Sequence, residues 1–214
     1  MANQQFVVSF KMPKNILHAT EAINRMMRDK WSKDAPINLC DLPKDNNAIV
    51  HMPIIRCITE TDDAVQFLFQ RTIQLLDRVN PKPINLLMEK IELRNDLVFW
   101  RVEEGFKTNR SGFRQLTSAL LDGHRGIGGL HEFSSNGFPL LKSWTPTENR
   151  NNRFYHDPNV RNWRVTAGRV RKELTFNELN LPRKWALDGQ IPAIIIGRCS
   201  GGRLIRVLAT IPLI

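Results

Sequence analysis

The sequence predicts an α+β fold: a ferredoxin-like βαββαβ lobe in residues 1–105, packed with a basic, β-rich lobe in residues 106–214. In the first part, short β-branched runs alternate with segments whose apolar residues recur at helical spacing. Residues 1–105 contain 14 basic and 14 acidic side chains, whereas residues 106–214 contain 17 basic and 7 acidic ones. Two apolar runs around a glycine-rich turn predict a C-terminal β-hairpin. Because these strands need a covering layer, the two lobes are expected to share a core.

The first lobe is predicted to contain strands and helices in the order β-α-β-β-α-β. Strands are predicted at residues 5–12, 36–43, 47–59 and 84–104, and helices at residues 18–31 and 60–79. Pro53 removes a backbone donor from the third run, which is therefore expected to be an edge strand, a bulged strand or two short pieces. Asn95 and Asp96 interrupt the last run, so it is either one long strand or a hairpin. This split βαβ order serves many functions and therefore fixes none.

The second lobe has fewer regular patterns. A helix is predicted at residues 111–123, because Ser111 is a suitable N-cap and Gly123 a suitable end. A strand is predicted at residues 163–170, where apolar and polar side chains alternate. The apolar runs on either side of residues 197–202 predict the C-terminal hairpin, whose last residues are expected to be buried in a sheet.

Basic and aromatic side chains are concentrated in residues 148–174 and around the C-terminal turn. Arginine has a flat guanidinium that binds phosphate through paired hydrogen bonds and stacks on bases. Aromatic rings stack on unpaired bases, a contact typically worth ~1–3 kcal/mol. Glycine-flanked arginines can form an anion-binding concavity from backbone N–H groups. The residues predicted to bind nucleic acid are Arg150, Arg153, Phe154, Tyr155, Arg161, Trp163, Arg164, Arg169, Arg171, Lys172, Arg198, Arg203 and Arg206.

A plainer interpretation of the same residues competes with this one. The aromatic rings can belong to the core and the arginines to a solvated face, and for Trp163 alone a core position is the better interpretation. The glycines at Gly197, Gly201 and Gly202 can simply permit a flexible hairpin turn.

The uneven charge distribution predicts a nucleic-acid-binding protein whose partner is RNA or another single-stranded nucleic acid. If about five arginines contact phosphate, affinity should fall with salt at a log–log slope of roughly −0.7 per contact. Further protein subunits of a larger assembly are a second class of partner. One alternative is a structural subunit of a viral particle or ribonucleoprotein, because apolar edges at residues 191–196 and 211–214 can pair with neighbouring chains.

A second alternative is a metal-independent endoribonuclease, for which the histidines of the basic half are the candidates. His124, His131 or His156 could act as general acid or base, while nearby arginines stabilise charge on the phosphorus. A surface or structural role is the simpler interpretation of each. His18 and His51 lie near apolar stripes and are predicted to be structural.

No metal and no cofactor are expected. Cys40, Cys57 and Cys199 are far apart and form no C-x-x-C pair. The glycine-rich loop at residues 123–129 lacks the Lys-Ser/Thr of a phosphate loop. The absence of a signal-peptide pattern and of an 18-residue apolar run predicts an intracellular, cytoplasmic protein with no membrane partner.

The layout of the chain resembles that of a known group of RNA-processing proteins. A βαββαβ lobe, a basic second lobe and a glycine-rich turn at Gly197, Gly201 and Gly202 are similar to the RAMP subunits of CRISPR systems. The glycine spacing departs from the usual loop of that family, and no histidine matches its catalytic one. The resemblance implies an RNA-processing subunit as a further alternative function.

Overall fold

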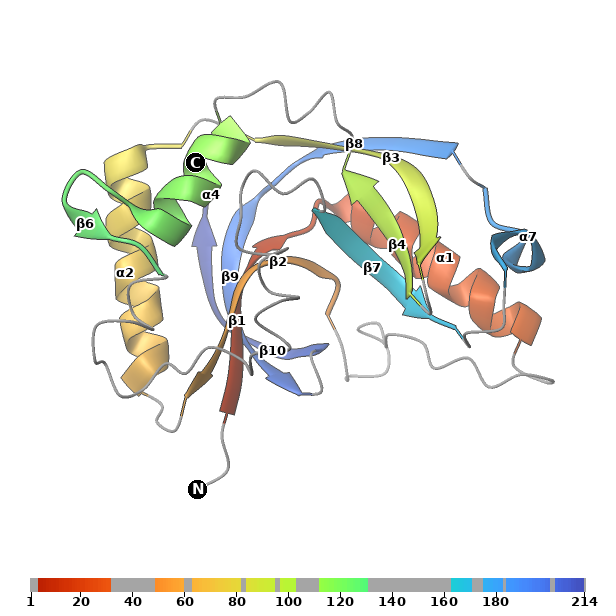
Figure 1. Cartoon of the computed structure of the whole chain (residues 1–214), viewed down its shortest axis with the longest axis horizontal. Helices are drawn as coiled ribbons and strands as arrows, with labels where there is room; N and C mark the ends of the chain where they lie inside the picture. Colours follow the sequence, from red (N-terminus) through yellow and green to blue (C-terminus); the bar gives the residue numbers. More distant parts are fainter. Residues whose placement is uncertain are drawn as a thin grey trace.

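The computed structural model is a mixed α/β structure with antiparallel sheets (Figure 1). It describes residues 4–31, 49–59, 63–81, 84–94, 97–102, 112–130, 163–170, 175–182, 184–200 and 203–213. The first sheet has the order β10-β9-β1-β2 and contains β1 (Gln4–Lys11), β2 (His51–Thr59), β9 (Ala193–Ser200) and β10 (Arg203–Pro212). The second has the order β7-β4-β3-β8 and contains β3 (Asn85–Arg94), β4 (Leu97–Val102), β7 (Arg164–Arg169) and β8 (Lys184–Gln190).

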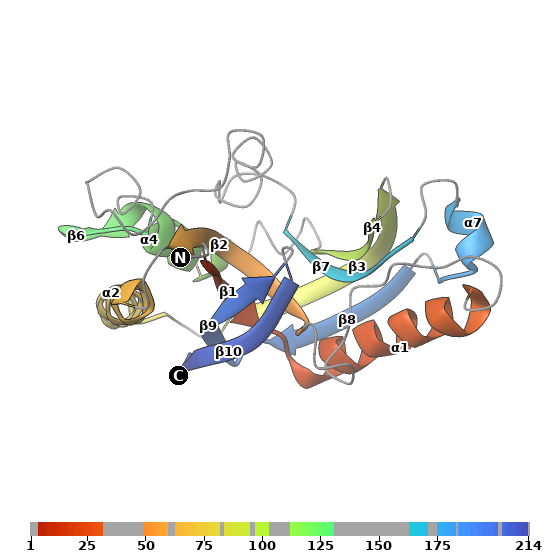
Figure 2. The same cartoon turned by 90° about the horizontal axis from the view of Figure 1, so that it is seen from below.

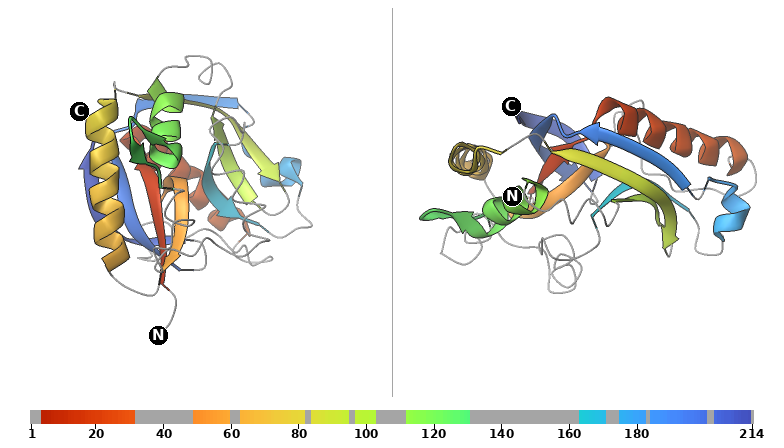
Figure 3. Two further views of the ribbon diagram at one scale, coloured as in Figure 1. Left: turned by 60° about the vertical axis from the view of Figure 1, so that its left-hand side comes forward. Right: turned by 90° about the horizontal axis from the view of Figure 1, so that it is seen from above.

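Helices cover one face of each sheet. α1 (Lys14–Trp31) packs on the second sheet, where the Asn24 side-chain amide donates a hydrogen bond to the Ala167 carbonyl oxygen at 2.9 Å (Figure 2). α2 (Asp63–Val79) and α4 (Gly112–Asp122) pack on each other and on the first sheet (Figure 3). The hairpin of β5 (Gly123–His124) and β6 (Ile127–Gly128) follows α4, and α7 (Phe176–Leu179) precedes β8.

The spacing of apolar residues explains which helix faces are buried. In α1, Ile16, Ile23 and Met27 are at most 1% exposed, and they recur seven and four positions apart, as one helical stripe requires. α2 is followed by Asn80, whose φ of 44° is the left-handed conformation typical of the residue after a helix. The Asn80 N–H donates to the Leu76 carbonyl oxygen at 2.8 Å and so satisfies one terminal carbonyl. Within the described ranges, no helix combines the length and apolar character needed to cross a membrane.

The two sheets meet at their inner edges. β2 is the last strand of the first sheet, β7 is the last strand of the second, and these two strands contact each other (Figure 1). Three aromatic rings hold the junction together. The Trp163 ring centre lies 5.0 Å from that of Phe113 and 6.3 Å from that of Phe10, and the latter two are 5.4 Å apart. Because these rings come from the start of β7, from α4 and from β1, the cluster links both sheets.

Most predicted elements of the first 105 residues are present. The run at residues 84–104 is the hairpin β3–β4, which confirms one of its two predicted forms. β2 lies at a sheet edge and is bulged opposite the Val8/Ser9 step, as Pro53 led us to expect. The predicted strand at residues 36–43 and the predicted cap Ser111 lie outside the described residues.

The ferredoxin-like arrangement itself is not confirmed. β1 and β2 pair with the C-terminal hairpin β9–β10, whereas β3 and β4 pair with β7 and β8. Each sheet therefore contains strands from both sides of residue 105, and the division into two lobes at that residue stays a prediction. β8 was not expected. Near the C-terminus, Ile211 is buried and Leu213 is partly buried against the core, as expected, whereas Val207 and Leu208 earlier in the edge strand β10 are each 37% exposed.

Gly197 gives a first test of this packing. It lies inside β9, and a Cβ there would come within 2.5 Å of the Arg206 carbonyl oxygen on β10. Gly197→Ala is expected to lower the free energy of unfolding by about 1–3 kcal/mol, because the two strands must separate. Gly112→Ala is the matched control, since its nearest neighbour would be at an ordinary 3.6 Å. Urea unfolding of both variants measures the difference, and equal stabilities would contradict the packing.

Candidate active site at the inner edges of the two sheets

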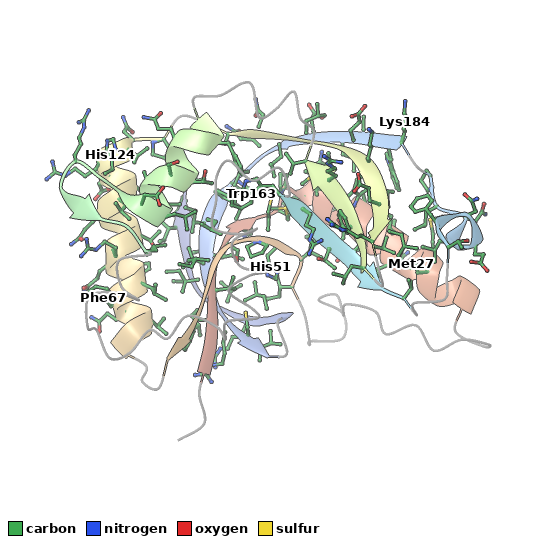
Figure 4. The ribbon with its side chains drawn as sticks, viewed as in Figure 1. Met27, His51, Phe67, His124, Trp163 and Lys184 are labelled. Carbon is green, nitrogen blue, oxygen red and sulfur yellow. The ribbon has the colours of Figure 1, made fainter. Side chains whose placement is uncertain are left out.

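His51 lies on the face of the first sheet that points away from the helices. It pairs with Lys11 across β1 and β2, while the next pair, Phe10 with Met52, faces the other way. Phe10 packs on Phe113 of α4, so the Phe10 side is the helix side. His51 therefore lies on the opposite face, at the first residue of the inner-edge strand (Figure 4).

A backbone hydrogen bond fixes the His51 ring. Nδ1 lies 2.7 Å from the Ile49 carbonyl oxygen, and the side chain is half-buried. A carbonyl oxygen only accepts, so Nδ1 carries the proton in this contact. When the ring is neutral, Nε2 is therefore its basic nitrogen, and this atom is buried in the structure. The same arrangement is used for histidines that accept or donate protons in catalysis.

The inner edge of the second sheet presents polar side chains. In β7, Val165 and Ala167 are fully buried, whereas the alternating residues Arg164 and Thr166 are partly exposed on the other face. The Arg164 guanidinium carbon lies 4.8 Å from the centre of the Phe99 ring, a cation–π distance that orients the guanidinium. β7 contacts the strand of His51, and one face of β7 carries the Arg164 guanidinium and the Thr166 hydroxyl.

The same face continues with charge across β4 and β3. Arg101 pairs with Arg164 in the β4–β7 ladder, so their side chains project on the same face. Its Nη1 donates to Glu92 Oε1 at 3.1 Å, with the two side chains 33% and 34% exposed. Because this ion pair is open to solvent, it contributes little to stability and mainly orders Arg101.

Four of the sequence-predicted nucleic-acid-binding residues have described side chains: Trp163, Arg164, Arg198 and Arg206. Trp163 is only 4% exposed and packs in the aromatic cluster at the sheet junction, so its ring is not available for stacking on a base. Arg164 lies at the candidate site. Arg198 lies on the helix face of the first sheet, 5.9 Å from the Phe6 ring centre. Arg206 is exposed on the edge strand β10.

The remaining predicted site residues cannot be placed. Arg169 and Arg203 belong to β7 and β10, but their side chains are not among those described. The following lie outside the described residues altogether: Arg150, Arg153, Phe154, Tyr155, Arg161, Arg171, Lys172, His131 and His156. Their role stays a prediction.

His51, which the structure places at the candidate site, was predicted from the sequence to be structural. His124 lies in the β5–β6 hairpin beside α2 and α4, far from His51 (Figure 4). The available sequence signal for His51 was its position at the start of a run that contains Pro53. Such a run predicts an edge strand, and an edge strand is open to solvent on one side. Within the described ranges, no group of three His, Cys, Asp or Glu residues is arranged to hold a metal ion.

Comparison with solved structures returns proteins of similar fold along the whole chain. The protein TT0787 of Thermus thermophilus superimposes with a TM-score of 0.51 at 14% identity, covering 98% of this chain and 97% of that one. A phosphoesterase gives 0.48 at 9% identity, covering 99% and 98%. E. coli LigT complexed with 3'-AMP gives 0.47 at 11% identity, covering 98% and 94%. No protein-family model and no curated protein sequence matches the chain.

These structures correct the function predicted from the sequence. The chain was expected to be a nucleic-acid-binding protein, with a RAMP-like or endoribonuclease subunit and a structural subunit as alternatives. The prediction of a plain nucleic-acid-binding protein is contradicted, because the solved structures returned by the comparison include one described as a phosphoesterase. The excess of basic residues in the second half predicts an anionic partner. It does not distinguish a protein that only binds this partner from an enzyme that acts on it.

Proposed function

We propose that the protein is an enzyme that cleaves a phosphoester bond of a nucleotide or RNA. His51 accepts the proton of the oxygen nucleophile that attacks phosphorus. The observation that carries the proposal is the fixed His51 ring, whose Nδ1 donates to Ile49 and whose Nε2 is the basic nitrogen. A proton acceptor held in one orientation is what attack of an oxygen nucleophile on phosphorus requires.

Arg164 and Thr166 supply the complementary chemistry. Cleavage of a phosphoester places additional negative charge on the phosphoryl oxygens in the transition state, and fixed donors stabilise that charge. The Arg164 guanidinium offers paired donors and is already oriented by Phe99 at 4.8 Å. Thr166 adds a hydroxyl on the same face of β7. The formal net charge of +10 favours the approach of an anionic substrate.

Arg164→Ala is expected to lower kcat/KM by about 10- to 100-fold, the range for losing a hydrogen bond to a charged group. Arg164→Lys should recover part of the loss, since it restores charge without the paired donors. The matched control is Arg206→Ala, which removes an exposed arginine from the distant strand β10. Equal effects of Arg164→Ala and Arg206→Ala would show that only bulk charge matters.

The test of the proposed function is an assay of the purified chain on end-labelled single-stranded RNA, the matching DNA, and a chromogenic phosphodiester. Products separated by gel and chromatography should show cleavage of at least one of these substrates. The cleavage must depend on His51, because a contaminating nuclease would not respond to a substitution in this chain. An inactive wild-type protein on all three substrates would refute the proposal.

A further inference from the structure

A second polar side chain lies beside His51, and it is fully buried. Ser9 in β1 is 0% exposed, and its Oγ has no hydrogen-bond partner within the described part of the chain. The other buried hydroxyls described there behave differently: Thr20, Thr72 and Thr117 each donate to the carbonyl oxygen four residues earlier, at 2.7–2.9 Å. Leaving a buried hydroxyl unpaired opposes folding, so a position that keeps one needs an explanation.

The strand register places Ser9 on the face that carries His51. Ser9 pairs with Pro53, and the pair after next is Lys11 with His51. Directly paired residues share a face, and so do residues two apart along a strand. Ser9 and His51 are therefore diagonal neighbours, a relation in which residues lie about 7–8 Å apart. A phosphoryl group is small enough to contact both side chains at once.

The ladder is regular from Ser9 to His51 but irregular on the other side of Ser9. The β1–β2 ladder shifts register at the Val8/Ser9 step, where β2 has one extra residue opposite. Such a bulge redirects the side chains next to it and is common beside active sites. Pro53, opposite Ser9, has no backbone N–H group, so it cannot donate a hydrogen bond to the Ser9 hydroxyl.

We propose that the Ser9 hydroxyl is a substrate-binding group that donates a hydrogen bond to a phosphoryl oxygen of the bound ester while His51 moves the proton. This inference rests on the proposed function and adds a residue to the same site. It explains why a buried hydroxyl is kept without a partner in this fold: its partner is the substrate. If the Ser9 hydroxyl binds substrate but destabilises the fold, removing it should lower activity and raise stability.

Ser9→Ala tests the inference through two readouts. Without substrate, the melting temperature should rise by about 2–4 °C, because the variant no longer buries an unpaired hydroxyl. With a chromogenic phosphodiester, kcat/KM should fall by about 10- to 100-fold. Ser9→Thr, which keeps the hydroxyl, should retain more activity than Ser9→Ala. Inorganic phosphate should raise the melting temperature of the wild type more than that of Ser9→Ala.

Thr72→Val is the matched control. It removes a buried hydroxyl that does have a partner, the Leu68 carbonyl oxygen at 2.7 Å, from a helix away from the inner edges. It should leave kcat/KM unchanged and should not raise the melting temperature.

The outcomes separate the two proposals. If His51→Ala abolishes activity while Ser9→Ala retains it, the inference on Ser9 is wrong and the proposed function stands. If Ser9→Ala loses activity together with melting temperature, Ser9 has a structural role and the inference is again wrong. If His51→Ala remains fully active, the proposed function itself fails. If phosphate stabilises wild type and Ser9→Ala equally, the hydroxyl does not contact phosphate.

Discussion

His51→Ala should reduce kcat/KM for the cleaved phosphoester by about 100- to 10,000-fold, the usual contribution of a positioned proton-transfer group. The expectation follows from the ring's fixed orientation, because a histidine held by the Ile49 carbonyl oxygen delivers its Nε2 without further ordering. The substitution removes Nε2 but should not disrupt β2, because position 51 is the first residue of the strand and its side chain is only half-buried. Folding should therefore change little.

Steady-state kinetics on the substrate found in the activity assay measure this effect. His124→Ala and His18→Ala are the controls, since one lies in the β5–β6 hairpin and the other is exposed on α1. Both should keep the wild-type rate. If His124→Ala lost activity and His51→Ala retained it, the active site would lie at the β5–β6 hairpin and not at His51. Circular dichroism of each variant confirms that the fold is intact.

Trp163→Ala should lower the free energy of unfolding by about 3–5 kcal/mol, the range for deleting a buried aromatic side chain. The ring is 4% exposed and lies edge-on to Phe113, with ring centres 5.0 Å apart. It also contacts Phe10, so its removal opens a cavity where β1, α4 and the start of β7 meet. Because this junction joins the two sheets, the loss should be larger than at a peripheral aromatic residue.

Urea unfolding followed by circular dichroism gives the comparison. Trp163→Phe should recover much of the stability, because a smaller ring still fills part of the space. Trp185→Ala is a second control, since Trp185 is only partly buried and contacts Trp100 at the second sheet's outer strand. Unchanged stability of Trp163→Ala would mean that the ring is not a core residue.

Local sequence signals predicted the elements in which neighbouring residues decide the structure. The apolar stripe of α2, the turn between β3 and β4, and the effect of Pro53 on β2 are all set by residues close in the chain. β8 lacked such a signal. Its side chains alternate between exposed and half-buried and include Lys184 and Asp188, so it resembles a loop until its pairing with β3 is known.

The pairing of distant strands could not be predicted in this way. Nothing near Phe6 or Val8 in the sequence shows that β9, about 190 residues later, lies alongside them. The βαββαβ pattern offered a shorter-range alternative, which the long-range pairs replaced. The candidate site was missed for the same reason: His51 and Arg164 belong to different sheets, and only the contact of β2 with β7 relates them.

The position of β1 inside its sheet also has a consequence for how the protein is made. β1 is paired on one side with β2 and on the other with β9, which starts at Ala193. A growing chain on the ribosome can form the β1–β2 pair early, yet the opposite edge of β1 must wait until β9 (Ala193–Ser200) has been synthesised. Phe6, Val8 and Phe10 then remain incompletely covered during translation, an interval in which chaperones and aggregation compete with folding.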